Sequence, residues 1–207
     1  MNINTNIPGW HDPQTLRKVA YYASQVPVDG HILELGALFG RTTYALGFNK
    51  HTSVKLTTID WWITYHLADF TINGMHDGLC GKDEPSYIHS RLSTAPDRIE
   101  GDDFYDIWKK FTAGINNHDH IRSSTQLLNS DFPMVDFIYH DAGHSYTDVY
   151  NDLTLWFPKL KHDGIIILDD YYRSQFPGLC DAVDVFVKEN TLYTEMITNR
   201  NILLRRQ

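Results

Sequence analysis

Residues 135–172 constrain the fold more than any other stretch of this sequence. Two short apolar runs, at 135–139 and 165–168, show no polar alternation, which is typical of parallel strands buried on both faces. Residues 145–157, between them, carry apolar side chains at helical spacing. A strand, a helix and a second strand in this order predict a βαβ unit with a right-handed crossover.

Three acidic residues follow these two apolar runs. Asp141 comes after the first run, and Asp169 and Asp170 end the second. Parallel strands direct their carboxyl ends to one edge, where ligands bind, and neighbouring strands lie about 5 Å apart, so we expect the three carboxylates in one small space. Like charges this close repel each other, so either a cation lies among them, or some of them are protonated, or their side chains point apart. An all-carboxylate site suits Mg²⁺, with Ca²⁺ or Mn²⁺ as alternatives; helix capping or exposure to water is the ordinary interpretation.

A glycine-containing turn follows the first predicted strand, at 31–35. Gly36 and Gly40 stand between this strand and a predicted helix, where glycine lets the backbone approach a ligand closely. The middle glycine of a dinucleotide-binding fingerprint is replaced by Leu38, which argues against a pyrophosphate on the helix N-terminus. A tight turn without any ligand is the alternative.

Asp60 directly follows the next predicted strand, at 54–59. An acid roughly 20–25 residues after the glycines fits a carboxylate that accepts both ribose hydroxyls of an adenosine ligand. NAD and S-adenosylmethionine (SAM) both carry that ribose, so Asp60 alone does not choose between them. A cap at the end of the strand is the simpler interpretation.

Taken together, these motifs resemble the class I SAM-dependent methyltransferases of the metal-dependent O-methyltransferase type, and most of all the macrocin O-methyltransferase and cephalosporin-hydroxylase-like group. The similar motifs are Glu34-x-Gly36-x-x-x-Gly40-x-Thr42, Asp141-x-x-His144-Ser145-Tyr146, Asp152, Lys161-x-x-Gly164 and Asp169-Asp170. The family commonly has Asp-Gly-Asp-His-Ser-Tyr where this chain has an alanine and a glycine after Asp141, so the second acid is missing. The resemblance spans nearly the whole chain except 61–101.

The resemblance implies an α/β fold: a doubly wound, Rossmann-like sheet of seven strands, mostly parallel with a C-terminal antiparallel hairpin, in three αβα layers. Residues 192–197 and 201–205 are predicted to form that hairpin. A length of 207 residues without a linker predicts a single domain, 1–207. The irregular, aromatic-rich segment 61–101 is predicted to be a lid over the substrate. A zinc site in this segment is an alternative, although the spacing of its four candidate ligands fits no standard set: His66, His76, Cys80 and His89.

The resemblance also implies a SAM site and a metal site. The residues expected to bind SAM are Glu34, Gly36, Gly40, Thr42, Asp60, Ser124 and Asp141. The expected metal, Mg²⁺ or another hard divalent cation, would be bound by Asp141, Asp169 and Asp170. His144 is the predicted general base, because the unperturbed pKa of histidine suits proton uptake near neutrality.

The implied reaction is transfer of a methyl group from SAM to a hydroxyl of a small molecule of the sugar or phenol type. A non-catalytic or differently active SAM-fold protein, which binds a small molecule or a partner, is the alternative. The acceptor, the metal and any homo-oligomer stay open from the sequence.

Charge and composition limit the class of partner and the location. The net charge of −8 and the lack of a basic run argue against nucleic acid, and no apolar run is long enough to span a membrane. The N-terminal residues lack the features of a signal peptide, and two cysteines do not make a disulfide framework. We therefore expect a cytoplasmic protein.

Overall fold

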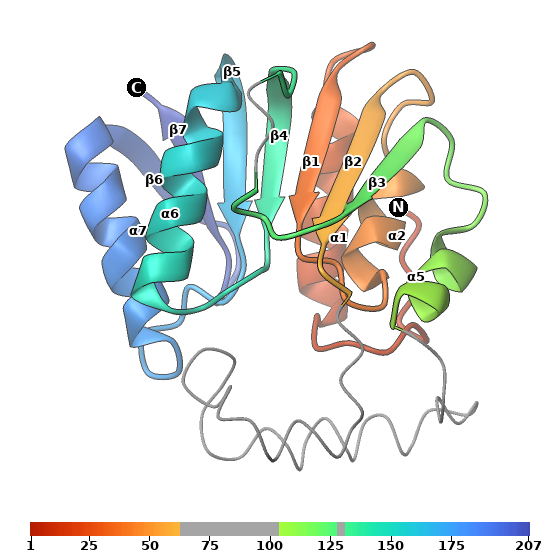
Figure 1. Cartoon of the computed structure of the whole chain (residues 1–207), viewed down its shortest axis with the longest axis horizontal. Coiled ribbons are helices and arrows are strands. Elements are labelled where there is room, and N and C mark those ends of the chain that lie inside the picture. The colour runs from red at the N-terminus through yellow and green to blue at the C-terminus, as the bar shows by residue number, and fades with distance from the viewer. Residues whose placement is uncertain (63–103, 128–130) are drawn as a thin grey trace.

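The computed structural model describes residues 1–62, 104–127 and 131–207, in which seven strands form one sheet of order β3-β2-β1-β4-β5-β7-β6 (Figure 1). The strands are β1 His31–Leu35, β2 Lys55–Asp60, β3 His118–Arg122, β4 Val135–His140, β5 Leu160–Leu168, β6 Leu192–Met196 and β7 Ile202–Arg206. Strands β1 to β5 pair in parallel, whereas β7 pairs antiparallel with both β5 and β6. The predicted Rossmann-like sheet with its C-terminal hairpin is thereby confirmed.

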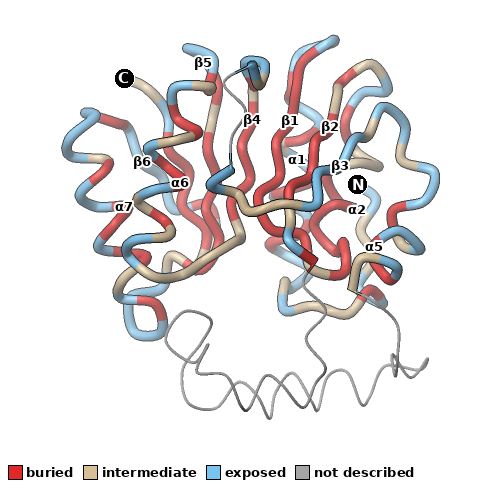
Figure 2. The backbone as a smooth tube through the Cα atoms, in the orientation of Figure 1, coloured by how far each residue is buried: buried red, intermediate tan, exposed pale blue. Residues whose placement is uncertain are grey.

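Helices cover both faces of this sheet. They are α1 Pro13–Gln25, α2 Arg41–Gly47, α5 Phe104–Thr112, α6 Tyr146–Trp156, the 3₁₀ helix η2 Phe157–Lys159 and α7 Pro177–Asn190. One apolar cluster joins α6 and α7 to the sheet, and a second joins α1 and α2 to the opposite face. Figure 2 shows the buried strands between helices with exposed outer surfaces. Within the described ranges, no helix combines the length and apolar character that a membrane span requires.

The helix starts follow the local sequence rules. The Asp12 carboxylate caps α1 by accepting hydrogen bonds from the backbone N–H groups of Gln14 and Thr15, at 2.7 and 2.8 Å. The Ser145 hydroxyl caps α6 by accepting from the Asp148 N–H at 3.1 Å. This second cap fixes where the chain turns from β4 into α6, and so positions the loop that contains Asp141 and His144.

Some predicted boundaries differ from the structure. β5 begins at Leu160 rather than at residue 165. The first part of the strand was not predicted because its residues 161–163 are polar and exposed and so lack the apolar pattern. β3 begins at His118 and is mostly exposed. α5 ends at Thr112, ahead of Gly114, whose φ of 88° lies in the left-handed region.

Two sequence-based predictions fall outside the described residues. Apart from Trp61 and Trp62, the predicted lid at 61–101 lies in the range 63–103, which the structure does not describe. The four residues of the zinc alternative lie there too. The lid therefore stays a prediction, and the zinc site stays an untested alternative.

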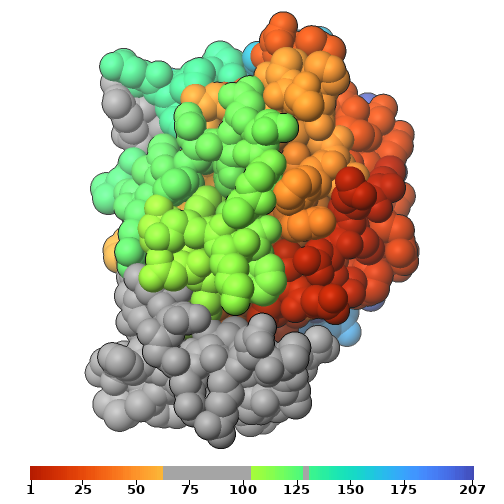
Figure 3. All heavy atoms as spheres, turned by 90° about the vertical axis from the view of Figure 1, so that its right-hand side faces the viewer, coloured from red at the N-terminus to blue at the C-terminus, as the bar shows by residue number. Residues whose placement is uncertain are grey.

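The N-terminal segment before α1 is fastened to the start of α2. Ile7 is fully buried and packs with Phe39 and Ile107. The buried Arg41 guanidinium donates to three carbonyl oxygens of the segment, at 2.8 Å to Thr5, 2.6 Å to Ile7 and 2.7 Å to His11. Figure 3 shows the segment in dark red beside the yellow-green residues of α5. The backbone position of His11 is thus fixed by the helix that begins after the glycine turn.

Candidate active site

The glycine turn touches the end of β4. The N–H of Gly36 donates to the Ile59 carbonyl at 2.9 Å, and the φ of Gly36 is +83°. A Cβ at this position would lie 2.0 Å from the carbonyl oxygen of Asp141. Only glycine allows both the positive φ and this close approach. The predicted cofactor turn and the predicted metal ligand Asp141 are therefore neighbours.

Glu34 lies inside the protein, beneath this turn. Its carboxylate accepts hydrogen bonds from the hydroxyls of Thr42 and Thr43, each at 2.7 Å, and of Thr58 at 2.9 Å. Burial of the fully enclosed Glu34 side chain raises its pKa to about 7, although the three hydroxyl donors oppose that rise. Glu34 and Thr42 thus fasten the start of α2 to β1 and β2. Direct contact of either residue with SAM stays a prediction.

The Asp60 carboxylate holds the glycine turn through backbone N–H groups of the turn. It accepts from the N–H groups of Ala37 at 2.7 Å, Leu38 at 2.9 Å and Trp62 at 2.7 Å. Burial raises the pKa of Asp60, while these three N–H groups act in the opposite direction. Leu38, which replaces the middle glycine of the fingerprint, has a left-handed φ of 48°. The turn is therefore shaped around the carboxylate predicted to bind ribose.

Ser124, one of the residues expected to bind SAM, follows the end of β3 and lies near the end of β2. The N–H of the preceding Ser123 donates to the Asp60 carbonyl at 3.0 Å. The Ser124 hydroxyl accepts from the Gln126 N–H at 3.2 Å and so closes a local turn. Binding of SAM by Ser124 stays a prediction.

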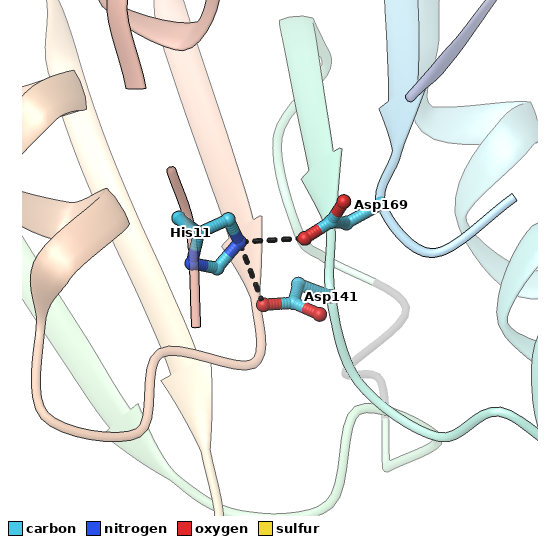
Figure 4. A group of neighbouring side chains, drawn as sticks. All are labelled: His11, Asp141 and Asp169. Carbon is cyan, nitrogen blue, oxygen red and sulfur yellow. Dashed lines mark ion pairs between the residues drawn. The ribbon is translucent and has the colours of Figure 1, made fainter. Parts of the chain in front are cut away.

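At the ends of β4 and β5, carboxylates and imidazoles form two sets that share Asp141. The first set is His11, Asp141 and Asp169; the second is Asp141, His144 and Asp170. The ligand atoms within each set all lie within 4.8 Å of one another. Figure 4 shows the His11 imidazole facing the Asp141 and Asp169 carboxylates.

The structure divides the three acids that the sequence was expected to gather at one point. The Asp169 carboxylate accepts from the Asn201 amide at 2.8 Å and contacts His11. Asp170 has a left-handed φ of 59° and pairs with His144 and Arg200. Asp141, Asp169 and Asp170 are thus not one converging set in this arrangement, because adjacent residues of a chain direct their side chains differently.

His11 is the residue that sequence analysis missed. Its Nε2 lies 2.7 Å from Asp169 Oδ2, 3.2 Å from Asp141 Oδ2 and 3.0 Å from the Tyr139 hydroxyl. Burial opposes charge on His11, but the Asp169 and Asp141 carboxylates outweigh it and raise the pKa of His11 to about 10. His11 in turn lowers the pKa of the Asp141 carboxyl, although the burial of this carboxyl acts in the opposite direction. No motif marks a histidine that precedes a helix cap.

His144, the predicted base, belongs to the second set. Its Nε2 lies 2.8 Å from Asp170 Oδ2, and its ring stacks on Phe176 with centroids 4.4 Å apart. The structure therefore brings His144 beside Asp141 and Asp170. The geometry alone does not assign its role in proton transfer.

A second buried histidine lies on the other side of β4. His140 Nε2 is 2.9 Å from Asp152 Oδ2, and the Thr125 hydroxyl donates to the other oxygen of Asp152 at 2.8 Å. The Trp156 indole N–H donates to the Thr125 carbonyl at 2.8 Å. This network ties α6 to the segment after β3 and to the strand end that precedes Asp141.

The comparisons with known proteins agree with the fold. A family described as a methyltransferase domain matches residues 33–171, which is more than half of the chain. No curated protein matches the sequence. Among solved structures, the O-methyltransferase NovP is 16% identical with a TM-score of 0.62, and the alignment covers 94% of this chain and 80% of NovP.

Two further structures show how widely this fold is used. CalS11, a TDP-rhamnose 3'-O-methyltransferase of calicheamicin biosynthesis, is 17% identical with a TM-score of 0.53 over 92% of this chain and 76% of its own. The ribosomal protein L11 methylase of Lactobacillus delbrueckii subsp. bulgaricus is 14% identical with a TM-score of 0.58 over 99% of this chain and 84% of its own. At these identities the similarity shows the fold and does not select a substrate.

Proposed function

We propose that this chain, which belongs to the methyltransferase domain family, is a SAM-dependent O-methyltransferase that uses a divalent cation and methylates a small hydroxylated molecule. The family match confirms the resemblance seen in the motifs, and with it the methyltransferase activity. The cation, the role of each residue and the acceptor are the proposed parts.

The observation that carries the proposal is the contact between Gly36 and the carbonyl of Asp141. It joins the turn expected to bind the methyl donor to the residues expected to bind the acceptor. A methyl transfer needs the two reactants side by side and in line, and fixed neighbouring sites provide that arrangement. Asp60 shapes the donor side through three backbone N–H groups.

The chemistry of the donor atoms fits a divalent cation. Carboxylate oxygens of Asp141, Asp169 and Asp170 are ligands that hard cations prefer. The residues of one set, or a rearranged combination of both, would hold it. When bound, a cation supplies a Lewis acid that lowers the pKa of an acceptor hydroxyl and orients its oxygen.

His144 has the position to take the proton that the acceptor loses. As the new O–C bond forms and the S–C bond of SAM breaks, the hydroxyl proton must leave the oxygen, and a neutral imidazole can accept it. In the present arrangement His144 Nε2 contacts Asp170 at 2.8 Å, so the acceptor hydroxyl must replace that contact. Catalytic contacts are often completed only when substrate is bound.

A small hydroxylated acceptor is supported by two independent facts. NovP is described as an O-methyltransferase, and CalS11 acts on a TDP-linked rhamnose. The net charge of −8 disfavours a polyanionic acceptor such as RNA, because phosphate binding needs a basic surface. We therefore propose a sugar or a phenol as the acceptor class.

The test is a two-stage experiment on the purified chain. Calorimetry should show binding of SAM and of its product S-adenosylhomocysteine. Transfer of labelled methyl groups to a panel of sugars and phenols should then stop with chelator and resume with Mg²⁺ or Mn²⁺. The Asp169→Asn variant should lose this activity, whereas the matched variant Asp163→Asn, at a fully exposed position on β5, should keep it.

Each stage has its own opposing result. Tight binding of NAD without response to SAM contradicts the cofactor. Full turnover in chelator contradicts the cation. Binding of SAM with no transfer to any acceptor would favour a SAM-fold protein that acts as a binding subunit.

A further inference from the structure

We propose that His11 is a ligand of the divalent cation at Asp141 and Asp169, so that the N-terminal segment is part of the metal site. The inference rests on the cation of the proposed function and adds a nitrogen donor to it. The resemblance gave only carboxylates for this site. His11 enters from a segment that precedes the matched methyltransferase residues 33–171.

The positions of the donor atoms support this assignment. His11 Nε2 lies 2.7 Å from one carboxylate oxygen and 3.2 Å from the other. Ligand atoms that sit next to each other around a small divalent ion are about 3 Å apart, because each bond to the ion is about 2.1 Å long. The two distances from His11 Nε2 therefore already match the spacing of neighbouring ligands, and the two carboxylate oxygens lie within 4.8 Å of each other.

The backbone that carries His11 is held in place independently of any ion. The Arg41 guanidinium donates to the His11 carbonyl at 2.7 Å, and the same group holds Thr5 and Ile7. The His11 side chain is only 9% exposed. The Asn201 amide donates to Asp169 Oδ1 at 2.8 Å, which orients this carboxylate while its Oδ2 faces His11. Ligands need such support to stay oriented, and here it comes from the start of α2 and from the turn between β6 and β7.

The second set also offers an imidazole, that of His144, so the choice between the sets needs an argument. In the second set, Arg200 already pairs with Asp170, which adds a fixed positive charge next to any cation. In the first set, His11 itself meets the charge of both carboxylates. A divalent ion can replace the proton on a histidine, but it cannot remove the charge of an arginine. The first set is therefore the better cation site.

A nitrogen ligand changes which ions the site prefers. Mg²⁺ and Ca²⁺ prefer oxygen donors. First-row transition ions accept an imidazole nitrogen more readily, and their affinity for it rises from Mn²⁺ toward the later ions. We therefore expect the site to favour Mn²⁺ over Mg²⁺ more strongly than three carboxylates would.

The test measures the ion directly. The full-length chain is freed of metal, loaded with Mn²⁺ and examined by pulsed electron paramagnetic resonance for coupling to a directly bound imidazole nitrogen. The wild type and His144→Gln should both show the coupling, and His11→Gln should lose it. His11→Gln should also bind Mn²⁺ at least about tenfold more weakly, as loss of a metal-site partner typically does, and the exposed control His51→Gln should be unchanged.

The outcomes separate this inference from the proposed function. Coupling that persists in His11→Gln and disappears in His144→Gln places the ion in the second set and overturns the inference. Bound Mn²⁺ without nitrogen coupling also overturns it, while the carboxylate site survives. If the chain binds no divalent ion at all, this result contradicts the cation of the proposed function as well. If His11→Gln does not fold, His144→Gln decides alone, because His11 is then the remaining imidazole of the two sets.

Discussion

The carbonyl oxygen of Asp141 occupies the place that a side chain on Gly36 would need. A Cβ built on Gly36 lies 2.0 Å from this oxygen, far inside van der Waals contact. β1 and β4 are neighbouring parallel strands, so their carboxyl ends meet at this point. The distance between the glycine turn and the acid cluster is therefore set by two backbones, which leave little freedom for adjustment.

Replacing Gly36 by alanine should destabilise the fold strongly. The new methyl group meets backbone, which cannot rotate away, and the residue keeps a φ of +83°. Strain and overpacking each cost about 1–3 kcal/mol, so we expect a loss of about 2–6 kcal/mol in the free energy of unfolding, measured with urea. Gly114→Ala is the matched control, because its φ is +88° and a Cβ there meets no atom within 4 Å. Equal losses in both variants would mean that the Asp141 contact does not matter.

The buried carboxyl of Glu34 should make stability depend on pH. Burial raises its pKa to about 7 from 4.5, so the folded state holds the proton more tightly than the unfolded state does. The contribution of Glu34 to stability is then highest below about pH 4.5, falls as the pH rises to about 7 and changes no further above that value. Relative to Glu34→Gln, which does not titrate, the wild type should lose up to about 3 kcal/mol across this window.

Urea unfolding at several pH values between 4.5 and 8 checks this expectation. The exposed Glu195 on β6 provides the control, and Glu195→Gln should follow the wild type at every pH. A wild-type stability that rises relative to Glu34→Gln between pH 4.5 and 7 would reverse the sign and refute the assignment.

Asp60→Asn should weaken SAM binding. The Asp60 carboxylate accepts hydrogen bonds from three backbone N–H groups. In the variant an amide NH₂ group replaces one oxygen, so two hydrogen-bond donors would face each other and one hydrogen bond would be lost. Loss of a hydrogen bond to a charged group costs about 1.5–3 kcal/mol, which is roughly a 10- to 100-fold increase in Kd by calorimetry. Asp119→Asn, an exposed acid on neighbouring β3, should bind SAM normally. Unchanged affinity in Asp60→Asn would show that the turn keeps its shape without this charge.

His144→Ala should lower kcat by about 10²–10⁴-fold and leave the Kd for SAM nearly unchanged, because a general base acts in the transition state and not in cofactor binding. A base must be neutral to accept a proton, so wild-type activity should fall toward low pH and the variant should lose that limb of the profile. His162→Ala is the control, since this histidine is 81% exposed. A wild-type kcat in His144→Ala would assign the proton to another group.

The sheet and much of its carboxyl edge were predictable, because their signals are local. The apolar runs of β4 and β5 and the acid that ends β2 each show in a few consecutive residues. Parallel pairing then brings the strand ends together without further information. The predicted C-terminal hairpin follows from the same kind of local pattern.

The parts that were missed depend on contacts between distant residues. His11 meets Tyr139 across 128 positions, and no periodicity or motif connects the two. The direction of neighbouring side chains is equally invisible: the left-handed backbone of Asp170 turns it toward His144 and away from Asp169. The polar extension of β5 was missed because its exposed residues lack the apolar pattern of a central strand.

Arg41 has a consequence for how the two halves of the site depend on each other. It is the first residue of α2, directly after Gly40, and it also fixes the backbone of His11. A cofactor that tightens the glycine turn would restrain the same arginine that positions the imidazole. If occupation of one side raises affinity at the other, thermodynamic reciprocity requires an equal factor in the opposite direction. SAM and the cation would then each report on the other's binding, with this guanidinium group as one of the links between them.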